Sequence, residues 1–174
     1  NAVYDGTSAI MLSGETAAGQ YPVEAVQTMS KIAESTEQNI NYTKRFHNAE
    51  FHIKNAVDAI SHSTCGMSGV LQASAIVACT LSGSTARMVS RFRPAAPIIG
   101  LTTDESTWRK LALSWGVIPA MCEKYTSVDV LFYMAKKIAG QMLPLQPGDK
   151  VVITGGSTSG RSGTTNLIKI EEME

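Results

Sequence analysis

The hydrophobic pattern divides most of the chain into short apolar runs and longer segments with helical spacing. Runs of strand length occur at 74–79, 97–102, 117–122 and 149–155. Short apolar runs of this kind are typical of strands that are buried on both faces of a parallel sheet. Between the runs, apolar residues recur three and four positions apart, which is the spacing of a helix. This alternation predicts a parallel sheet with right-handed crossovers.

The helices of this region are predicted at 52–71, 84–92, 104–114 and 127–142, with Asp104 suited to the N-cap of the third. On the first helix, the predicted inward-facing residues are Ile53, Val57, Ile60, Thr64, Met67 and Leu71. On the last helix, they are Val130, Leu131, Met134, Ile138 and Met142.

A final strand is predicted at 164–172, close enough behind the preceding strand to form a hairpin. We expect it to be an antiparallel edge strand. The predicted fold class is therefore α/β, with a small, mostly parallel sheet of about five strands and helices on both faces.

The first 46 residues carry one further strand and helix. The apolar run "SAIMLS" at 8–13 predicts a buried strand, and Pro22 fits the first turn of a helix. The polar stretch 39–50 is interpreted as a linker. A single strand–helix unit cannot cover its own strand edges, so this unit looks incomplete. We predict two parts, an orphan βα unit at 1–46 and a complete small α/β domain at 47–174.

Composition and charge exclude several classes of protein. Of the 174 residues, 44% are hydrophobic, which is enough for a packed core, and the formal net charge is zero, without the basic excess of a nucleic-acid-binding protein. No apolar run approaches the roughly 20 residues of a membrane span, and no secretory signal opens the sequence. The three cysteines show no metal or disulfide spacing and are interpreted as small hydrophobic residues. These features predict a cytoplasmic protein without nucleic-acid or membrane partners.

The segment after the 74–79 strand places hydroxyl side chains and a glycine where a helix begins. Ligands of open α/β sheets lie beyond the carboxyl ends of the strands, and a helix start offers unpaired N–H groups and a favourable dipole to an anion. The residues predicted to hold a phosphate group are Thr80, Ser82, Gly83, Ser84 and Thr85. Ser and Thr are also ordinary N-caps and turn residues, so a purely structural role is the alternative.

A second loop, "TGGSTSGRSGTT" at 154–165, has a similar composition and also follows a strand. A parallel sheet would bring both loops to the same edge. Arg161 lies in the middle of this loop, where its guanidinium could bind phosphate with two hydrogen bonds. The alternative is a solvated hairpin. Two such loops on one edge favour an anion-binding site.

Long stretches of the sequence resemble the pyruvate kinase family. "NAVYDGTSAIMLSGETAAGQYPVEAVQTMSKIAESTE" resembles the eighth strand and helix of that family's (β/α)₈ barrel. "TLSGSTARMVSRFRPAAPIIGLT" resembles the start of its carboxy-terminal domain, and "GDKVVITGG" with "GTTNLIKI" its end. The resemblance implies a parent enzyme of glycolysis that transfers a phosphoryl group from phosphoenolpyruvate to ADP with Mg²⁺ and K⁺.

The resemblance also implies what this chain lacks. Ser13 and Glu15 would lie at the edge of the parent active site, with a turn residue and a helix-proximal carboxylate as the structural alternatives. A (β/α)₈ barrel needs roughly 250 residues, and the family's catalytic lysine, acidic metal-binding pair and phosphate-binding arginine are expected upstream of residue 1. We therefore expect the isolated chain to be inactive and to hold no cofactor or metal of its own.

For the second part, the resemblance implies an allosteric effector site and subunit contacts in a homotetramer. The 80–85 segment, called the hydroxyl loop below, corresponds to the family's effector phosphate loop. The second loop would place Arg161, Ser162 and Gly163 near the ligand. Leu81 and Ser84 stand where some members carry basic residues. Fewer cations favour a sugar phosphate or a nucleotide monophosphate over a bisphosphate.

Two alternatives to an effector-binding domain remain open. The first is a structural or assembly domain whose effector site does not sense a metabolite. The second is an unrelated α/β enzyme, which the sequence favours least because no nucleophile–base pair or metal cluster emerges.

Overall fold

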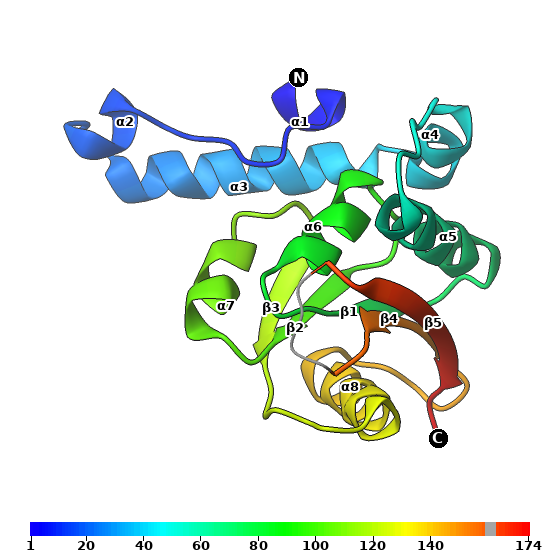
Figure 1. Cartoon of the computed structure of the whole chain (residues 1–174). Helices are drawn as coiled ribbons and strands as arrows, with labels where there is room; N and C mark the ends of the chain where they lie inside the picture. Colours follow the sequence, from blue (N-terminus) through cyan, green and yellow to red (C-terminus); the bar gives the residue numbers. More distant parts are fainter. Residues whose placement is uncertain (159–162) are drawn as a thin grey trace. The chain divides into compact units, whose positions relative to one another are not determined.

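The structure, a computed structural model, describes residues 1–158 and 163–174 (Figure 1). The chain forms two compact units, Asn1–Asn41 and Tyr42–Glu174. The predicted sites Arg161 and Ser162 lie outside the described residues. The assignment of 1–46 to a barrel and 47–174 to a regulatory domain stays a prediction.

The first unit is helical and contains α1 (Ala2–Asp5), α2 (Gly14–Ala17) and α3 (Pro22–Gln38). Pro22 begins α3 as predicted. The predicted strand at 8–13 is wrong, because this segment has no strand conformation and Met11 is 86% exposed. A strand needs a neighbouring strand to pair its backbone groups, and the first unit offers none.

The second unit alternates strands and helices after two opening helices. Its elements are α4 (Tyr42–Asn48), α5 (Ala56–Val70), β1 (Ala75–Cys79), α6 (Ser84–Arg91), β2 (Ile98–Thr102), α7 (Glu105–Leu111), β3 (Val117–Met121), α8 (Val128–Met142), β4 (Lys150–Gly156) and β5 (Thr165–Glu172). The predicted linker at 39–50 is therefore partly wrong, because α4 lies within it. The predicted strands and helices of the α/β region are confirmed to within a few residues.

The sheet has the order β3-β2-β1-β4-β5. The neighbours among β1 to β4 are parallel, and β5 is an antiparallel strand at the edge. In this register, Val77 of β1 lies between Ile99 of β2 and Ile153 of β4. All five residues of β1 and of β2 are buried, which explains their uninterrupted apolar sequences. The predicted fold class is confirmed.

Helices cover both faces of the sheet, as Figure 1 shows. Ile76 and Ala78 of β1 pack toward α5, α6 and α7, whereas Val77 and Cys79 pack toward α8. This division follows from the two-residue period of a strand, which sends successive side chains to opposite faces. The connections β1-α6-β2 and β2-α7-β3 therefore cross one face, and the β3-α8-β4 connection crosses the other.

The predicted inward face of α5 is only partly right, because Thr64 is buried as predicted but none of the large apolar residues is fully buried. Its buried residues are small or polar, namely Asp58, Ser61, Thr64, Cys65 and Ser68. Thr64 Oγ1 and Ser68 Oγ each donate to a carbonyl of the preceding turn, whereas the buried Ser61 Oγ has no hydrogen-bond partner among the described residues. Met67, which was predicted to face inward, is 40% exposed. Small side chains allow α5 to approach the sheet closely.

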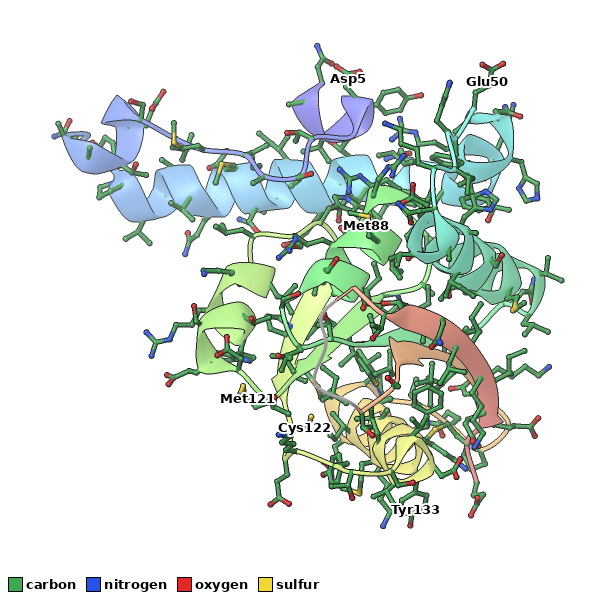
Figure 2. The ribbon with its side chains drawn as sticks, in the orientation of Figure 1. Asp5, Glu50, Met88, Met121, Cys122 and Tyr133 are labelled. Atoms are coloured by element: carbon green, nitrogen blue, oxygen red, sulfur yellow. The ribbon has the colours of Figure 1, made fainter. Side chains whose placement is uncertain are left out.

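The predicted inward face of α8 needs a similar correction. The buried residues of α8 are Phe132, Ala135 and Ala139, whereas Val130 and Met142 are exposed. The alanines let the helix lie close to the sheet, and Phe132 fills the space beside them. On the opposite side, Tyr133 points away from the sheet (Figure 2). Of the residues predicted to face inward, Leu131 and Ile138 do pack against the core, so periodicity located the helix and part of its inward face.

The predicted N-cap of α7 is confirmed. The Asp104 carboxylate accepts a hydrogen bond from the Thr107 backbone N–H at 2.6 Å. This bond stabilises the charged form and lowers the pKa of Asp104 below its usual value. The cap fixes the start of α7, the helix that packs beside the hydroxyl loop after β1.

Candidate functional site

The candidate site lies at the carboxyl ends of the parallel strands, where the topology changes direction. β1 and β4 are neighbours, but the helix after β1 lies on one face of the sheet and the helix before β4 lies on the other. Such a switch point leaves a crevice that is the usual ligand site of open α/β sheets. Here it forms a cavity of about 310 Å³.

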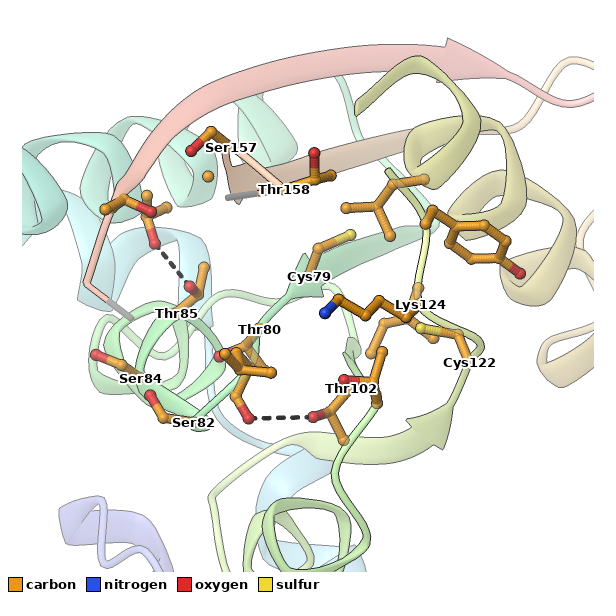
Figure 3. Close-up of a pocket in the computed structure, with 18 of the residues that line it drawn as sticks. Cys79, Thr80, Ser82, Ser84, Thr85, Thr102, Cys122, Lys124, Ser157 and Thr158 are labelled. Atoms are coloured by element: carbon orange, nitrogen blue, oxygen red, sulfur yellow. Dashed lines mark hydrogen bonds between the residues drawn. The ribbon is translucent and has the colours of Figure 1, made fainter. Parts of the chain in front are cut away.

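The cavity is bounded by segments from across the whole domain. Its described lining comes from the loops after β1, β2 and β3, from Leu131 of α8, and from both sides of the β4–β5 connection. Figure 3 shows the side chains that surround it. The four predicted hydroxyl residues Thr80, Ser82, Ser84 and Thr85 all line it, and so does Gly163. The two loops that the sequence indicated therefore meet at one cavity.

Gly83 lies behind this wall as the N-cap of α6. It has a left-handed conformation, with φ at 80°, that side chains rarely adopt. A Cβ atom there would lie 2.7 Å from Arg87 Nη1 and 3.3 Å from Leu111 Cδ2. Gly83 therefore lets the chain turn sharply, so that the first N–H groups of α6 lie beside the cavity.

Hydrogen bonds hold the hydroxyl loop in place from outside the cavity. The Leu81 carbonyl accepts from Thr107 Oγ1 at 3.1 Å, and the Ser82 carbonyl accepts from Arg87 Nη1 at 3.2 Å. Because these two carbonyls already accept hydrogen bonds from the protein, they are not unpaired acceptors beside the cavity. That arrangement suits an anion.

Thr85 is already partnered. Its Oγ1 lies 2.6 Å from Thr165 Oγ1, and both residues are buried (dashed in Figure 3). The bond joins the start of α6 to the start of β5. Thr165 is the last residue of the predicted second loop, but the sequence did not indicate its bond to Thr85, which lies 80 positions away.

The β3–α8 connection supplies lining residues that sequence analysis also missed. They are Cys122, Glu123, Lys124 and Tyr125. In Figure 3 the Lys124 side chain reaches into the cavity toward Thr80. From the sequence alone, a single lysine in this segment does not indicate a ligand site, because the loops that it faces lie far away in sequence.

The floor of the cavity is uncharged. Burial raises the pKa of the Cys79 thiol, and nearby Cys122 raises it further. Burial likewise raises the pKa of Cys122. Both thiols stay protonated at neutral pH and, together with Leu101 and Leu131, give the cavity an apolar floor.

Ser13 and Glu15 belong to the first unit. Ser13 is the N-cap of α2, and its backbone N–H donates to Glu15 Oε2 at 3.0 Å. Backbone hydrogen bonds lower the pKa of Glu15. This geometry matches the structural alternative for both residues, and their place at the edge of a parent active site stays a prediction.

The described residues do not fit a metal site. Across 1–158 and 163–174, no group of three or more His, Cys, Asp or Glu side chains could hold a metal ion. Within the same residues, no helix combines the length and the apolar character that crossing a membrane requires.

Comparisons with known proteins agree with the resemblance along the whole chain. The family model "Pyruvate kinase, alpha/beta domain" matches residues 58–171, and "Pyruvate kinase, barrel domain" matches residues 1–26. Both matches follow the order expected from the sequence.

The alignments with curated relatives extend over almost the whole chain. A pyruvate kinase of Clostridium acetobutylicum is 47% identical over 175 residues, covering 100% of this chain and 37% of the relative. A pyruvate kinase of Clostridium perfringens is 39% identical, and the alignment covers 99% of this chain and 37% of the relative. A pyruvate kinase of Geobacillus stearothermophilus is 43% identical, and the alignment covers 98% of this chain and 29% of the relative. The chain thus spans roughly a third of the length of these relatives, and it belongs to the pyruvate kinase family.

Proposed function

We propose that this chain is the carboxy-terminal regulatory part of a pyruvate kinase and that its cavity binds a phosphorylated allosteric effector. The observation that carries the proposal is the meeting of the 80–85 loop with Gly163 and Thr164 around one cavity of about 310 Å³. Pockets of this size hold small metabolites. The same domain would contribute contacts to neighbouring subunits.

The chemistry of the cavity wall favours phosphate over other ligand groups. The first turn of α6 offers backbone N–H groups, and Ser82 and Ser84 add hydroxyl donors beside them. Phosphate oxygens accept several hydrogen bonds at once and carry the negative charge that a helix N-terminus favours. A neutral ligand would use fewer of these donors.

The cavity also has a physical connection to the edge of the sheet. Thr85 lines the cavity and bonds to Thr165, the first residue of β5. A ligand that orders the 80–85 loop would therefore bias the position of β5, one of the two edge strands of the sheet. Allosteric control would follow if two arrangements of the subunits bound the effector with different affinities.

Ligand-dependent melting tests effector binding. AMP and glucose 6-phosphate are expected to raise the melting temperature of the chain, because a ligand at 100 times its Kd adds about 2.7 kcal/mol, or roughly 5–10 °C for a domain of this size. The double variant Ser82→Ala/Thr85→Ala should lose the rise. The control Ser106→Ala, which changes an exposed serine of α7, should keep it.

The comparison uses the ligand-induced rise of each variant, since losing the Thr85–Thr165 bond also lowers the melting temperature without ligand. If no phosphate compound shifts the melting of the wild-type chain, the sensing role is wrong. An assembly domain would then be the better interpretation.

We further propose that the parent protein transfers a phosphoryl group from phosphoenolpyruvate to ADP and that this chain alone does not. A barrel of the family needs roughly 250 residues, and phosphoryl transfer depends on placed cations and metal ions. The expected result is no pyruvate formation above background when the chain is incubated with phosphoenolpyruvate, ADP, Mg²⁺ and K⁺. Pyruvate production by the purified chain would contradict this proposal.

A further inference from the structure

Lys124 lies between β3 and α8, and it lines the cavity from the side opposite to the α6 loop (Figure 3). We propose that the Lys124 ammonium group binds the phosphate of a phosphate monoester and is the main countercharge for that ligand among the described residues. The inference rests on the proposed function of the cavity and adds a binding residue and a ligand class to it.

The charge of Lys124 is available to a ligand. The ion pairs within the described part of the chain involve Arg91, Arg109, Lys136 and Lys169, and Lys124 is not among them. Its side chain is exposed, so the ammonium group is not held by packing. Figure 3 shows it extending over the cavity rather than away from it.

The cavity needs a cation if it is to hold phosphate tightly. Hydroxyl and backbone donors are neutral, whereas a phosphate monoester carries roughly −1.5 to −2 charges at pH 7. A lysine supplies a point charge, and charge-assisted hydrogen bonds are about twice as strong as neutral ones. The only other charged residue of the described lining is Glu123, which disfavours a second anionic group.

The rest of the cavity defines the ligand class. One ammonium group that extends toward Thr80 converges on the same place as the α6 N-terminus, and this suits one phosphate rather than two. The floor formed by Cys79, Leu101 and Leu131 is uncharged and suits a neutral, partly apolar body. Sugar phosphates and nucleoside monophosphates share this chemistry.

The test measures binding of inorganic phosphate, glucose 6-phosphate and AMP to the full chain by calorimetry. Lys124→Met is expected to weaken every ligand that the wild type binds by about tenfold to a hundredfold, the range of a hydrogen bond to a charged group. Lys124→Arg should restore most of the affinity because it keeps the charge. Lys137→Met is the matched control, because the Lys137 ammonium lies over the Tyr133 ring of α8 and outside the cavity lining.

The outcomes separate this inference from the proposed function. If the wild type binds a phosphate ester and Lys124→Met binds it equally well, the role of Lys124 is wrong while the effector site stands. Equal losses in Lys124→Met and Lys124→Arg would also overturn it, since the charge would then be irrelevant. If the wild type binds none of the three probes, both proposals are wrong. Binding of AMP alone or of glucose 6-phosphate alone would show whether the cavity floor accepts a nucleoside or a sugar as the neutral part of the ligand.

Discussion

Replacing Phe92 with alanine is expected to lower the free energy of unfolding of the Tyr42–Glu174 unit by about 3–5 kcal/mol, the usual cost of removing a buried Phe side chain. Phe92 is 1% exposed and caps the C-terminus of α6. Its ring packs edge-on against the rings of Phe51 and His62, with centroid-to-centroid distances of 4.8 Å and 5.3 Å. The cavity left behind would be lined by rings from two separate segments, Phe51 before α5 and His62 within it, which cannot both move inward freely.

Urea denaturation followed by tryptophan fluorescence measures this loss. Both tryptophans, Trp108 and Trp115, lie in the second unit, so the signal reports the unit that contains Phe92. Tyr133→Ala is the control, because Tyr133 is 53% exposed and its removal should cost less than about 1 kcal/mol. If both variants lose the same free energy of unfolding, the buried contacts of Phe92 contribute no more stability than an exposed aromatic residue.

The sequence predicted the sheet well because its central strands leave little ambiguity. Every position of β1 and β2 is buried, so each strand appears as a continuous apolar run that no exposed helix would show. The strand predicted at 8–13 has a similar apolar composition but no neighbouring strand. An apolar run reports a preference for burial, and whether a strand forms depends on a pairing partner elsewhere in the chain.

The helices were predicted in position but only partly in the faces that they bury. Periodicity located α5 and α8, but the faces that pack on the sheet are built from small residues such as Ser61 and Ala135. Large apolar residues were predicted to mark the inward face, whereas close helix–sheet packing selects small side chains. Such a choice depends on the distance between two elements, and local sequence does not contain that distance.

The candidate site was predicted where its residues are contiguous and was missed where they are not. The 80–85 loop stands out because hydroxyl groups, a glycine and a helix start adjoin each other. Lys124 reaches the same cavity only through the parallel order of the strands. Once that order is known, the residues that follow each parallel strand become candidates, and Lys124 is one of them.

Replacing Gly83 with alanine is expected to weaken binding of phosphate esters at least about tenfold and to destabilise the unit by about 1–3 kcal/mol, the usual cost of a strained backbone conformation. The left-handed φ of 80° disfavours any side chain. The new methyl group would also displace Arg87, whose Nη1 atom bonds to the Ser82 carbonyl. Relief of this strain would rotate the first N–H groups of α6 away from the cavity.

The matched control for Gly83→Ala is Gly69→Ala. Gly69 lies within α5 with no atom near the position of a Cβ, so alanine there should be neutral or stabilising by up to about 1 kcal/mol. Calorimetric titration with the tightest phosphate ester, together with urea denaturation, measures both effects. A Gly83→Ala chain that is destabilised but binds with wild-type affinity would show that the α6 turn supports the fold without shaping the ligand site. Loss of binding at this position but not in Gly69→Ala is the result expected if backbone N–H groups hold the phosphate, because alanine at 83 alters no hydroxyl or cation of the cavity.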